Sequence, residues 1–325
     1  MIKLLWRTDV HMADRTPKRR TGSWILDVTE KLEWVGDLAT DIGADFVLDG
    51  GDFFDVKSPL KNSHGLVRET FNCHKGYPCP IYCLVGNHDV KYGKYEYLPE
   101  QPLGVLFSSG LFKELGDEKE IILKKGGVKI RVVGVPYHGT VYDFDRIKSI
   151  AKKDEDYLLV ACHLLASKGK TSSMFESEDI VGYDFLNENK EVDAWFFGHW
   201  HKDQGITELS NGATVVNVGS LTRGSLHLDD LDRKPCVVEV QIDKNGLSFI
   251  RHNVPVKEAH VAFKIEETIR EKSDDERMEQ IVDKMKSIAT SGWSDLTLKE
   301  RVTSIKEASS GAKELAISYL EEVEK

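Results

Sequence analysis

The sequence predicts an α/β fold of two packed, mainly mixed β-sheets flanked by helices, with a small helical appendage at the C-terminus. Three observations support this prediction. Strand-like apolar runs alternate with amphipathic helices over residues 2–85, further strands follow over residues 121–251, and residues 264–325 are charged and poor in strand formers. Alternating strands and helices are typical of a parallel sheet, and the later strands indicate a second sheet packed on the first.

The first sheet is predicted from three short strands, at residues 2–8, 45–48 and 81–85. Between them, apolar residues at helical spacing predict one helix over residues 27–41 and another over about residues 62–75. Because a helix connects each strand to the next, the strands at the start of this sheet should run parallel.

The middle of the chain is richer in β structure. Residues 121–123 and 128–135 flank a Lys-Lys-Gly-Gly sequence and predict a hairpin. The later strands are predicted at residues 157–161, 194–197, 214–218, 237–242 and 247–251.

Two domains are expected, one spanning residues 1–255 and a helical C-terminal region spanning residues 256–325. Apolar residues recur at helical spacing in the second of these, at Ile265, Ile269, Met278, Ile281, Val282, Met285 and Ile288. Such helices could cap the first domain or bind a partner protein.

The composition is that of a globular protein of the cytoplasm. The 325 residues are 40% hydrophobic and 30% charged, no apolar run is long enough to span a membrane, and the N-terminus lacks the pattern of a signal peptide. The five cysteines form no Cys-x-x-Cys pair, and Cys162 and Cys236 lie in apolar runs. Buried thiols in a reducing compartment are therefore expected.

The formal net charge of −10 is unusual for a protein that binds nucleic acid, because contacts to phosphates need positive charge. Metal ions in a carboxylate-rich site, or basic clusters such as Lys18-Arg19-Arg20, can supply that charge locally. The acidic composition therefore does not exclude a nucleic-acid substrate.

Side chains that can bind metal follow the ends of five predicted strands. They are Asp9, His11, Asp52, Asn87, His88, His163, His199 and His201. Ligands of open α/β sheets gather outside these carboxyl ends. Because oxygen and imidazole donors without thiolates suit Mn, Fe, Zn or Mg, we predict a site for one of these metals at this edge.

The local spacing supports the same interpretation. Asp9 and His11 are two residues apart, as are His199 and His201, so each pair points to one side at its strand end. Glycines that should let the backbone turn sharply precede three of the candidate ligands, at Gly51, Gly86 and Gly198.

The other histidines are expected to be surface or hydrogen-bonded residues rather than ligands. They are His64, His74, His227, His252 and His260. His138 also follows an apolar strand and is a weaker candidate for the site.

Five blocks, read in order, resemble the signature of the calcineurin-like metallophosphoesterases. The blocks are Asp9-x-His11, Gly51-Asp52-x-x-Asp55, Gly86-Asn87-His88-Asp89, His163 after an apolar strand, and Gly198-His199-x-His201. Together they span residues 9–201. The resemblance implies a phosphoesterase with two metal ions and the four-layer fold of that superfamily.

Within the superfamily the chain most resembles the SbcD nuclease, its eukaryotic counterpart in double-strand-break repair, and phage recombination endonucleases. The likeness rests on residues 52–56 with Ser58-Pro59 after them, on Asp14-Arg15 ahead of a long helix, and on the loop of residues 217–223. Arg7-Thr8 departs from the pattern, since a serine before the aspartate is commoner there. The C-terminal region is also shorter than the family's DNA-capping domain.

By this resemblance, one ion is held by Asp9, His11, Asp52 and His201, and the other by Asp52, Asn87, His163 and His199. Asp52 then bridges two divalent ions, expected to be Mn with Mg, Fe or Zn as alternatives, and these ions activate a water molecule.

His88 is implied as the general acid that protonates the leaving oxygen. Asp55 and Asp89 could orient its imidazole or brace a ligand, or they could simply cap the local structure.

The resemblance implies a Mn-dependent DNA exonuclease or endonuclease that acts with an SbcC-like ATPase of the SMC type in DNA repair, recombination or phage replication. Such enzymes are typically homodimers, and the helix at about residues 62–75 is a candidate interface. The alternative is a stand-alone phosphodiesterase or phosphatase for small molecules such as cyclic nucleotides. A scaffold without catalytic activity is disfavoured, because every ligand position and His88 are intact.

Overall fold

The computed structural model describes residues 1–169, 177–225 and 233–270, with separate positions between 299 and 317. The chain divides into two compact units, Met1–Phe263 and Lys264–Lys325. Several of the predicted C-terminal helical positions lie outside the described residues: Met278, Ile281, Val282, Met285 and Ile288. The division of roles between residues 1–255 and 256–325 stays a prediction.

The first sheet contains the three strands predicted at the start of the chain. Its order is β14-β13-β1-β2-β3-β4; the strands β1, β2 and β3 run parallel, as predicted, and β4 adds a fourth parallel strand that the sequence does not predict. The strands are β1 (Ile2–Arg7), β2 (Phe46–Asp49), β3 (Ile81–Cys83), β4 (Lys113–Glu114), β13 (Cys236–Asp243) and β14 (Gly246–Asn253). The late hairpin β13-β14 returns to this sheet and pairs antiparallel with β1.

The second sheet has the order β11-β12-β10-β7-β6-β5, with a parallel centre and antiparallel strands at both edges. Its strands are β5 (Ile121–Lys125), β6 (Val128–Val135), β7 (Tyr157–His163), β10 (Ala194–Gly198), β11 (Gly205–Glu208) and β12 (Thr214–Asn217). The predicted hairpin is β5-β6. A short pair, β8 (Ala166–Ser167) and β9 (Val181–Gly182), lies apart from both sheets in the strand pairing.

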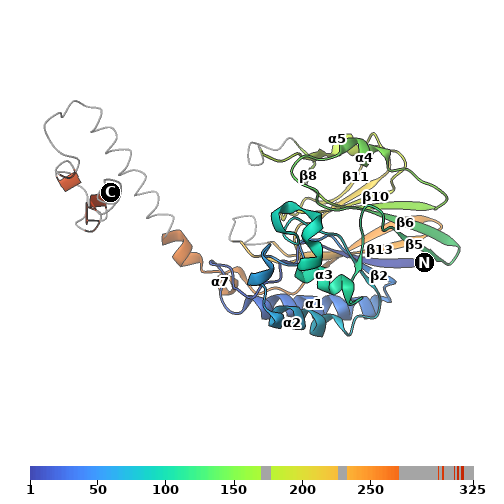
Figure 1. The fold of residues 1–325 in the computed structure, drawn as a ribbon. Helices are drawn as coiled ribbons and strands as arrows, with labels where there is room; N and C mark the ends of the chain where they lie inside the picture. The colour runs from blue at the N-terminus through green and yellow to red at the C-terminus, as the bar shows by residue number, and fades with distance from the viewer. Residues whose placement is uncertain are drawn as a thin grey trace, which may run out of the picture. The chain divides into compact units, whose positions relative to one another are not determined.

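Helices flank the two sheets on both outer faces. The helices are α1 (Trp24–Ile42), α2 (His64–His74), α3 (Pro102–Ser108), α4 (Phe144–Ser149), α5 (Tyr183–Leu186) and α7 (Ala259–Ala262). Three further 3-10 segments are η1 (Pro59–Lys61), η2 (Lys91–Gly93) and η3 (Tyr95–Glu100). Figure 1 shows α1 and α2 on one outer face and α4 and α5 on the other, with the sheets between. The predicted fold class, two mixed sheets flanked by helices, is confirmed.

Helix α1 begins three residues before its predicted start because of its cap. The Ser23 hydroxyl accepts a hydrogen bond from the Leu26 N–H, which satisfies one of the free donors of the first turn. At the other end Gly43, with a φ of 65°, donates its N–H to the carbonyls of Ala39 and Thr40.

The core follows from the two-residue alternation of side chains along each strand. In β1, Ile2, Leu4 and Trp6 belong to the cluster between the two sheets, whereas Leu5 belongs to the cluster under α1 and α2. In β10, Phe196 faces the other sheet and Trp195 faces the α4 and α5 side. Strands that are buried on both faces explain the continuous apolar runs in the sequence.

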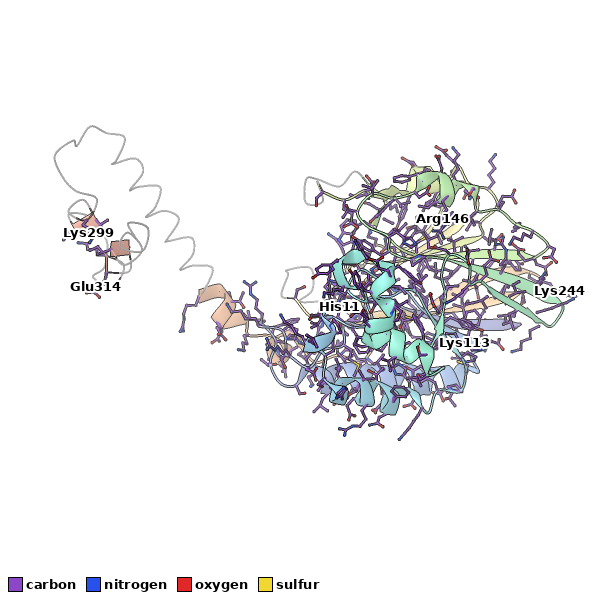
Figure 2. The ribbon with its side chains drawn as sticks, in the orientation of Figure 1. His11, Lys113, Arg146, Lys244, Lys299 and Glu314 are labelled. Atoms are coloured by element: carbon purple, nitrogen blue, oxygen red, sulfur yellow. The ribbon has the colours of Figure 1, made fainter. Side chains whose placement is uncertain are left out.

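The parallel strands of both sheets deliver their carboxyl ends to one end of this unit. In Figure 2 His11, just after β1, lies at the opposite end of the strands from Lys244, in the turn between β13 and β14. The polar residues that follow the strands are therefore brought to one edge.

Candidate metal centre

The candidate ligands are all placed at or just past the carboxyl end of a strand. Asp9 and His11 follow β1, Asp52 follows β2, Asn87 follows β3, His163 ends β7, and His199 and His201 follow β10. Backbone hydrogen bonds tie the first two of these turns together, since the N–H groups of Asp9 and His11 donate to the carbonyls of Gly51 and Asp52.

The backbone is strained at these ligands. Asp9, His11, Asp52 and His199 all have positive φ angles, between 50° and 89°, and Tyr92 is the one other non-glycine residue of this kind in the described part of the chain. A side chain beyond glycine adopts this region at a cost, and such residues cluster at functional sites. The strain thus marks the same residues as the sequence pattern.

Four of the candidate ligands form one cluster. The ligand atoms of Asp9, His11, Asp52 and His201 all lie within 4.8 Å of one another. The His11 Nε2 atom is 3.9 Å from an Asp9 oxygen and 3.7 Å from Asp52 Oδ2, and 2.9 Å from Nε2 of His201. Two imidazoles and two carboxylates therefore converge on one point.

The other candidate ligands form a second cluster that shares Asp52. His163 Nε2 lies 3.4 Å from Asp52 Oδ1 and 3.2 Å from the Asn87 side-chain oxygen. Ligand atoms of Asp52, His163 and His199 again lie within 4.8 Å of one another. Asp52 presents Oδ2 to His11 and Oδ1 to His163, so its carboxylate is shared by the two clusters and lies between two potential ion sites.

Three of the histidines are fixed by a hydrogen bond on the ring nitrogen that faces away from the clusters. His11 Nδ1 is 3.1 Å from Asp55 Oδ1, His163 Nδ1 donates to the Gly50 carbonyl at 2.7 Å, and His199 Nε2 is 3.1 Å from Glu178 Oε1. Metal-binding histidines are oriented in this way, by a carboxylate or carbonyl that holds the second nitrogen. The arrangement leaves the inward nitrogens available as donors to a cation.

The Asn87 amide gives an independent test of whether the site suits a cation. Its oxygen points into the second cluster, towards Nε2 of His163, while an amide turned the other way would donate to Asp52, His163 and His199 and accept from Lys57 Nζ at 3.3 Å. An oxygen that faces a carboxylate is favourable when a cation lies between them. The donor set of oxygens and imidazoles therefore fits divalent ions such as Mn, Fe, Zn or Mg.

The Asp52 carboxyl and the His163 imidazole shift each other's pKa. Burial by itself raises the pKa of the Asp52 carboxyl, but His163 and then His11 bring that pKa well below its ordinary value. Burial lowers the pKa of His163, yet the neighbouring Asp52 raises it to about 9. Since metal ligands must be deprotonated, a cation bound here would replace the proton on His163.

His88 lies at the edge of both clusters. Its Nδ1–H donates to the Asp55 carbonyl at 2.6 Å, and its backbone N–H donates to Asp52 Oδ1 at 2.7 Å. The His88 ring meets the His11 ring edge-on at 4.8 Å, and the side chain is about one-third exposed. With Nδ1 bonded, the Nε2 atom is the one that can exchange a proton with a substrate.

The two flanking aspartates have different contacts. Asp55 holds His11 through its carboxylate and His88 through its carbonyl. Asp89 is buried and accepts from the backbone N–H groups of Phe53, Phe54 and Gly86. Asp89 therefore braces the turns that carry Asp52 and Asn87 and makes no hydrogen bond to the His88 imidazole.

Thr8 stands where a serine is commoner, before the aspartate, and it provides the same hydroxyl group that a serine would. Its hydroxyl donates to Asp9 Oδ2 at 2.7 Å. The loop of residues 217–223 supports the same turn, because Leu221 N–H donates to the Thr8 carbonyl and the Thr222 hydroxyl donates to the Val10 carbonyl.

The glycines before the ligands serve two purposes, and the sequence predicts one of them. Gly51 has a φ of 91°, in agreement with a sharp turn. Gly86 and Gly198 lie outside the positive-φ region. They are needed for space, because a Cβ atom would lie 2.2 Å from Asp52 Oδ1 at Gly86 and 2.2 Å from the Thr8 hydroxyl at Gly198.

The remaining histidines have other surroundings. His74 is buried against Arg7, His252 binds Glu239, and His138 binds Asp117 at the surface. His64 and His260 belong to none of the ligand clusters found in the described residues. His227 lies outside those residues.

The basic cluster Lys18-Arg19-Arg20 is less available than the sequence indicates. Arg20 is 5% exposed, pairs with Asp27 at 2.8 Å and lies over the rings of Trp24 and Phe263. Its guanidinium is part of the core packing, so it contributes nothing to a phosphate-binding surface.

Sequence reasoning misses two charged residues of the site, Glu178 and Lys57. Glu178 accepts from the Tyr142 hydroxyl at 2.8 Å as well as facing His199. It follows no strand end and has no ligand spacing, so no local signal marks it. Lys57 lies within the segment of residues 52–59 on which the nuclease likeness rests, which could have drawn attention to it.

Comparisons with known proteins agree with this geometry. The pattern of the calcineurin-like phosphoesterases matches residues 3–203. The DNA double-strand break repair protein Mre11 of Saccharolobus solfataricus is 28% identical over 141 residues, which cover 43% of this chain and 35% of that protein. The matched segment thus spans about a third of that relative.

Two solved structures share the fold. A protein assigned as a 5′-nucleotidase from Staphylococcus aureus has a TM-score of 0.54 at 17% identity, covering 84% of this chain and 58% of its own. A dimetal phosphatase from Danio rerio has a TM-score of 0.51 at 10% identity, covering 78% of this chain and 99% of its own. No helix among the described residues has the length and apolar character needed to cross a membrane.

Proposed function

The chain belongs to the calcineurin-like phosphoesterase family, and we propose that within it the protein is a Mn²⁺-dependent DNA nuclease of the SbcD type that hydrolyses phosphodiester bonds. The observation that carries the hydrolytic part is the position of Asp52, whose carboxylate is shared by two ligand clusters. The similarity to Mre11, together with the SbcD-like segments, supports DNA as the substrate.

In this proposal one ion is held by Asp9, His11, Asp52 and His201 and the other by Asp52, Asn87, His163 and His199. Bound ions would polarise a phosphoryl oxygen and make a water molecule nucleophilic at neutral pH. The protein itself positions the groups: Asp55, Glu178 and the Gly50 carbonyl hold the imidazoles.

The role proposed for His88 is to donate a proton to the leaving oxygen. Its Nδ1–H is fixed on the Asp55 carbonyl, so Nε2 is the atom that carries and delivers the proton. The side chain is partly exposed beside the shared carboxylate of Asp52, which is where a phosphodiester would have to lie.

The proposal includes an SbcC-like ATPase as partner, a homodimer, and a place in DNA repair, recombination or phage replication. It also places the protein in the cytoplasm, which agrees with the free thiols of all five cysteines. These parts rest on the resemblance to SbcD-type nucleases and need their own tests.

The test is a cleavage assay on linear single-stranded, linear double-stranded and circular DNA with Mn²⁺, Mg²⁺ or EDTA, run beside bis-p-nitrophenyl phosphate and cyclic nucleotides. We expect DNA cleavage that needs Mn²⁺ and increases when a cognate ATPase subunit is added. The Asp52→Asn protein, purified in the same way, controls for contaminating nucleases. Robust hydrolysis of cyclic nucleotides without DNA cleavage would replace the proposal by the small-molecule alternative.

A further inference from the structure

We propose that residues 91–97, beside the candidate metal centre, form a stacking surface for the bases of an unpaired DNA strand, with Tyr92 as the principal stacking residue. The inference rests on the proposed nuclease function and specifies the form of DNA that enters the site. The segment reads Lys-Tyr-Gly-Lys-Tyr-Glu-Tyr and follows the Gly-Asn-His-Asp motif after one residue, Val90.

The Tyr92 side chain is held in solvent at a conformational cost. It is 72% exposed, although most of the large apolar and aromatic side chains of this unit are buried. Its φ is 58°, and Gly93 follows with a φ of 64°. Glycine or asparagine would adopt this conformation more easily. A tyrosine at this position is therefore difficult to explain by folding and is better explained by a ligand that needs the ring.

The neighbours of Tyr92 are anchored, so the ring has a firm base. The Tyr95 hydroxyl donates to Glu114, and Leu98 is buried. The Tyr97 ring meets the Tyr92 ring edge-on, with 5.8 Å between their centroids. The Tyr92 ring is thus flanked by Tyr97 and still 72% exposed, which leaves room for a base to stack on it.

The segment packs against Tyr137, a side chain that also contacts the candidate ligands. A Cβ atom at Gly93 would contact the Tyr137 ring at 3.5 Å. That ring in turn lies 5.6 Å from the ring of His199 and 6.4 Å from the ring of His163, both candidate ligands. Tyr92 is thus the sequence neighbour of Gly93, which packs on Tyr137, and Tyr137 contacts the candidate ligands of the second ion site. A base stacked on Tyr92 would belong to the same bound strand as the reacting phosphate.

Lysines next to the aromatic rings supply positive charge that the acidic chain as a whole lacks. Lys91 Nζ lies 4.8 Å from the centroid of the Tyr92 ring, and the Lys94 side chain is 64% exposed, with Nζ 3.9 Å from an oxygen of the equally exposed Glu96. Lys57 Nζ lies 3.3 Å from the outward end of the Asn87 amide. Alternating aromatic rings and cations are the usual means of binding single strands, in which rings stack on bases and cations follow the phosphates.

An unpaired strand fits this surface better than a duplex. In a duplex the faces of the bases are already stacked on one another, so an exposed ring has no free face to cover. An unpaired nucleotide offers both faces, and any base can stack. The surface therefore favours single strands or frayed ends without a preference for sequence.

The test compares two oligonucleotides with the same backbone charge: dT12 and a 12-mer of abasic residues. Fluorescence anisotropy is measured with Mn²⁺ in the slow His88→Gln background, so that the strands persist. Adding Tyr92→Ala should lower the preference for dT12 over the abasic strand by about 5- to 150-fold, the equivalent of roughly 1–3 kcal/mol. Tyr92→Phe should keep the preference, because its ring remains.

The matched control is Ile122→Ala, which removes an exposed apolar side chain on the edge strand β5 and should leave the preference intact. An unchanged preference in Tyr92→Ala would overturn the inference. An equal loss of affinity for both strands would also overturn it, because it would indicate a structural role for Tyr92. If Tyr92→Ala converted a dimer to a monomer and kept the preference, the segment would be a contact between two copies of the chain, and the inference would again fail.

The outcome is separable from that of the proposed function. If the unmodified protein binds dT12 through Tyr92 but cleaves no DNA under any metal, the nuclease proposal fails and the stacking surface stands. If it cleaves DNA and Tyr92→Ala keeps the base preference, the nuclease proposal stands and the stacking surface is contradicted.

Discussion

Two groups of charged residues lie near the ends of strands β1 and β2. Arg7 and Asp49 end the two strands, and Asp9 and Asp52 follow a few residues later. The two groups have different surroundings. Arg7 donates through Nε to Asp49 at 2.7 Å, through Nη1 to the Tyr77 hydroxyl at 2.9 Å and through Nη2 to His74 at 3.1 Å. Both side chains of the Arg7–Asp49 pair are fully buried. In this Arg7 network the two charges neutralise each other, and both residues have the backbone conformation of a regular strand.

The ligand cluster beyond it has the opposite character. Asp9 and Asp52 have left-handed backbones, and their carboxylates face imidazole nitrogens at 3.4–3.9 Å rather than a guanidinium. Strain and close polar contacts are tolerated here because neighbouring structure fixes them. The comparison indicates that the Arg7 network serves folding, whereas the ligand cluster is organised in advance for cations.

Asp52→Asn should have the largest effect, since it weakens the one carboxylate that both clusters share. Metal ions supply several kcal/mol of transition-state stabilisation, so hydrolysis of bis-p-nitrophenyl phosphate should fall by roughly 10³-fold or more. Elemental analysis should show both ions reduced, whereas His11→Ala should mainly lose one.

Asp243→Asn, at the far end of the strands, is the matched control and should keep both the activity and the metal. If Asp52→Asn retained two ions per chain, Asp52 would not bridge them. The proposed difference between the Arg7 network and the ligand cluster would then lose its basis.

His88→Gln should affect the chemistry and leave the metals in place. The rate on DNA should drop by about 10²–10⁴-fold, the usual contribution of a positioned general acid. The loss should be smaller for bis-p-nitrophenyl phosphate, because p-nitrophenolate departs without a proton. Loss of metal in proportion to activity would instead make His88 a ligand or a structural residue.

Asp55→Asn and Glu178→Gln should separate the two ion sites. Each carboxylate holds one histidine, His11 and His199 respectively, and removal of such a partner typically lowers metal affinity by about 10–100-fold. Titration with Mn²⁺ should show one weakened binding step in each variant, and a different step in the two. An identical effect on both steps in both variants would contradict the assignment of separate ions.

His74→Gln should have the smallest effect, on stability alone. Burial, and then Arg7, hold the pKa of His74 well below its ordinary value. The unfolded chain binds a proton near pH 6.5 and the folded chain does not, so stability falls as the pH drops below that value. This one group accounts for about 2 kcal/mol between pH 7 and pH 5.

Urea unfolding in EDTA at pH 7 and pH 5 should show that His74→Gln loses less stability on acidification than the unmodified protein. His64→Gln, an exposed histidine on the same helix α2, should behave like the unmodified protein. Equal acid sensitivity in all three proteins would mean that the Arg7 network does not keep His74 neutral.

Much of the fold follows from local pattern. The parallel run from β1 to β3, the hairpin β5-β6 and helix α1 are predictable because strand alternation, turn residues and helical spacing act over a few residues. The return of β13 and β14 to the first sheet is a long-range pairing with β1, for which the sequence carries no local signal.

The candidate site likewise contains residues whose positions could be predicted from the sequence and residues whose positions could not. Strand ends place Asp9, Asp52 and His163 at one edge, so their meeting could be predicted. Glu178 reaches His199 from a loop, and Arg20 turns into the core to pair with Asp27. Both depend on tertiary packing, which a charged residue in a sequence does not reveal.

The most direct test of the two-ion account is anomalous diffraction from crystals grown with Mn²⁺. We predict two peaks per chain, about 3.5–4 Å apart, with one oxygen of Asp52 on each: the first between Asp9, His11 and His201, the second between Asn87, His163 and His199. A single peak, or two peaks without Asp52 between them, would contradict the account.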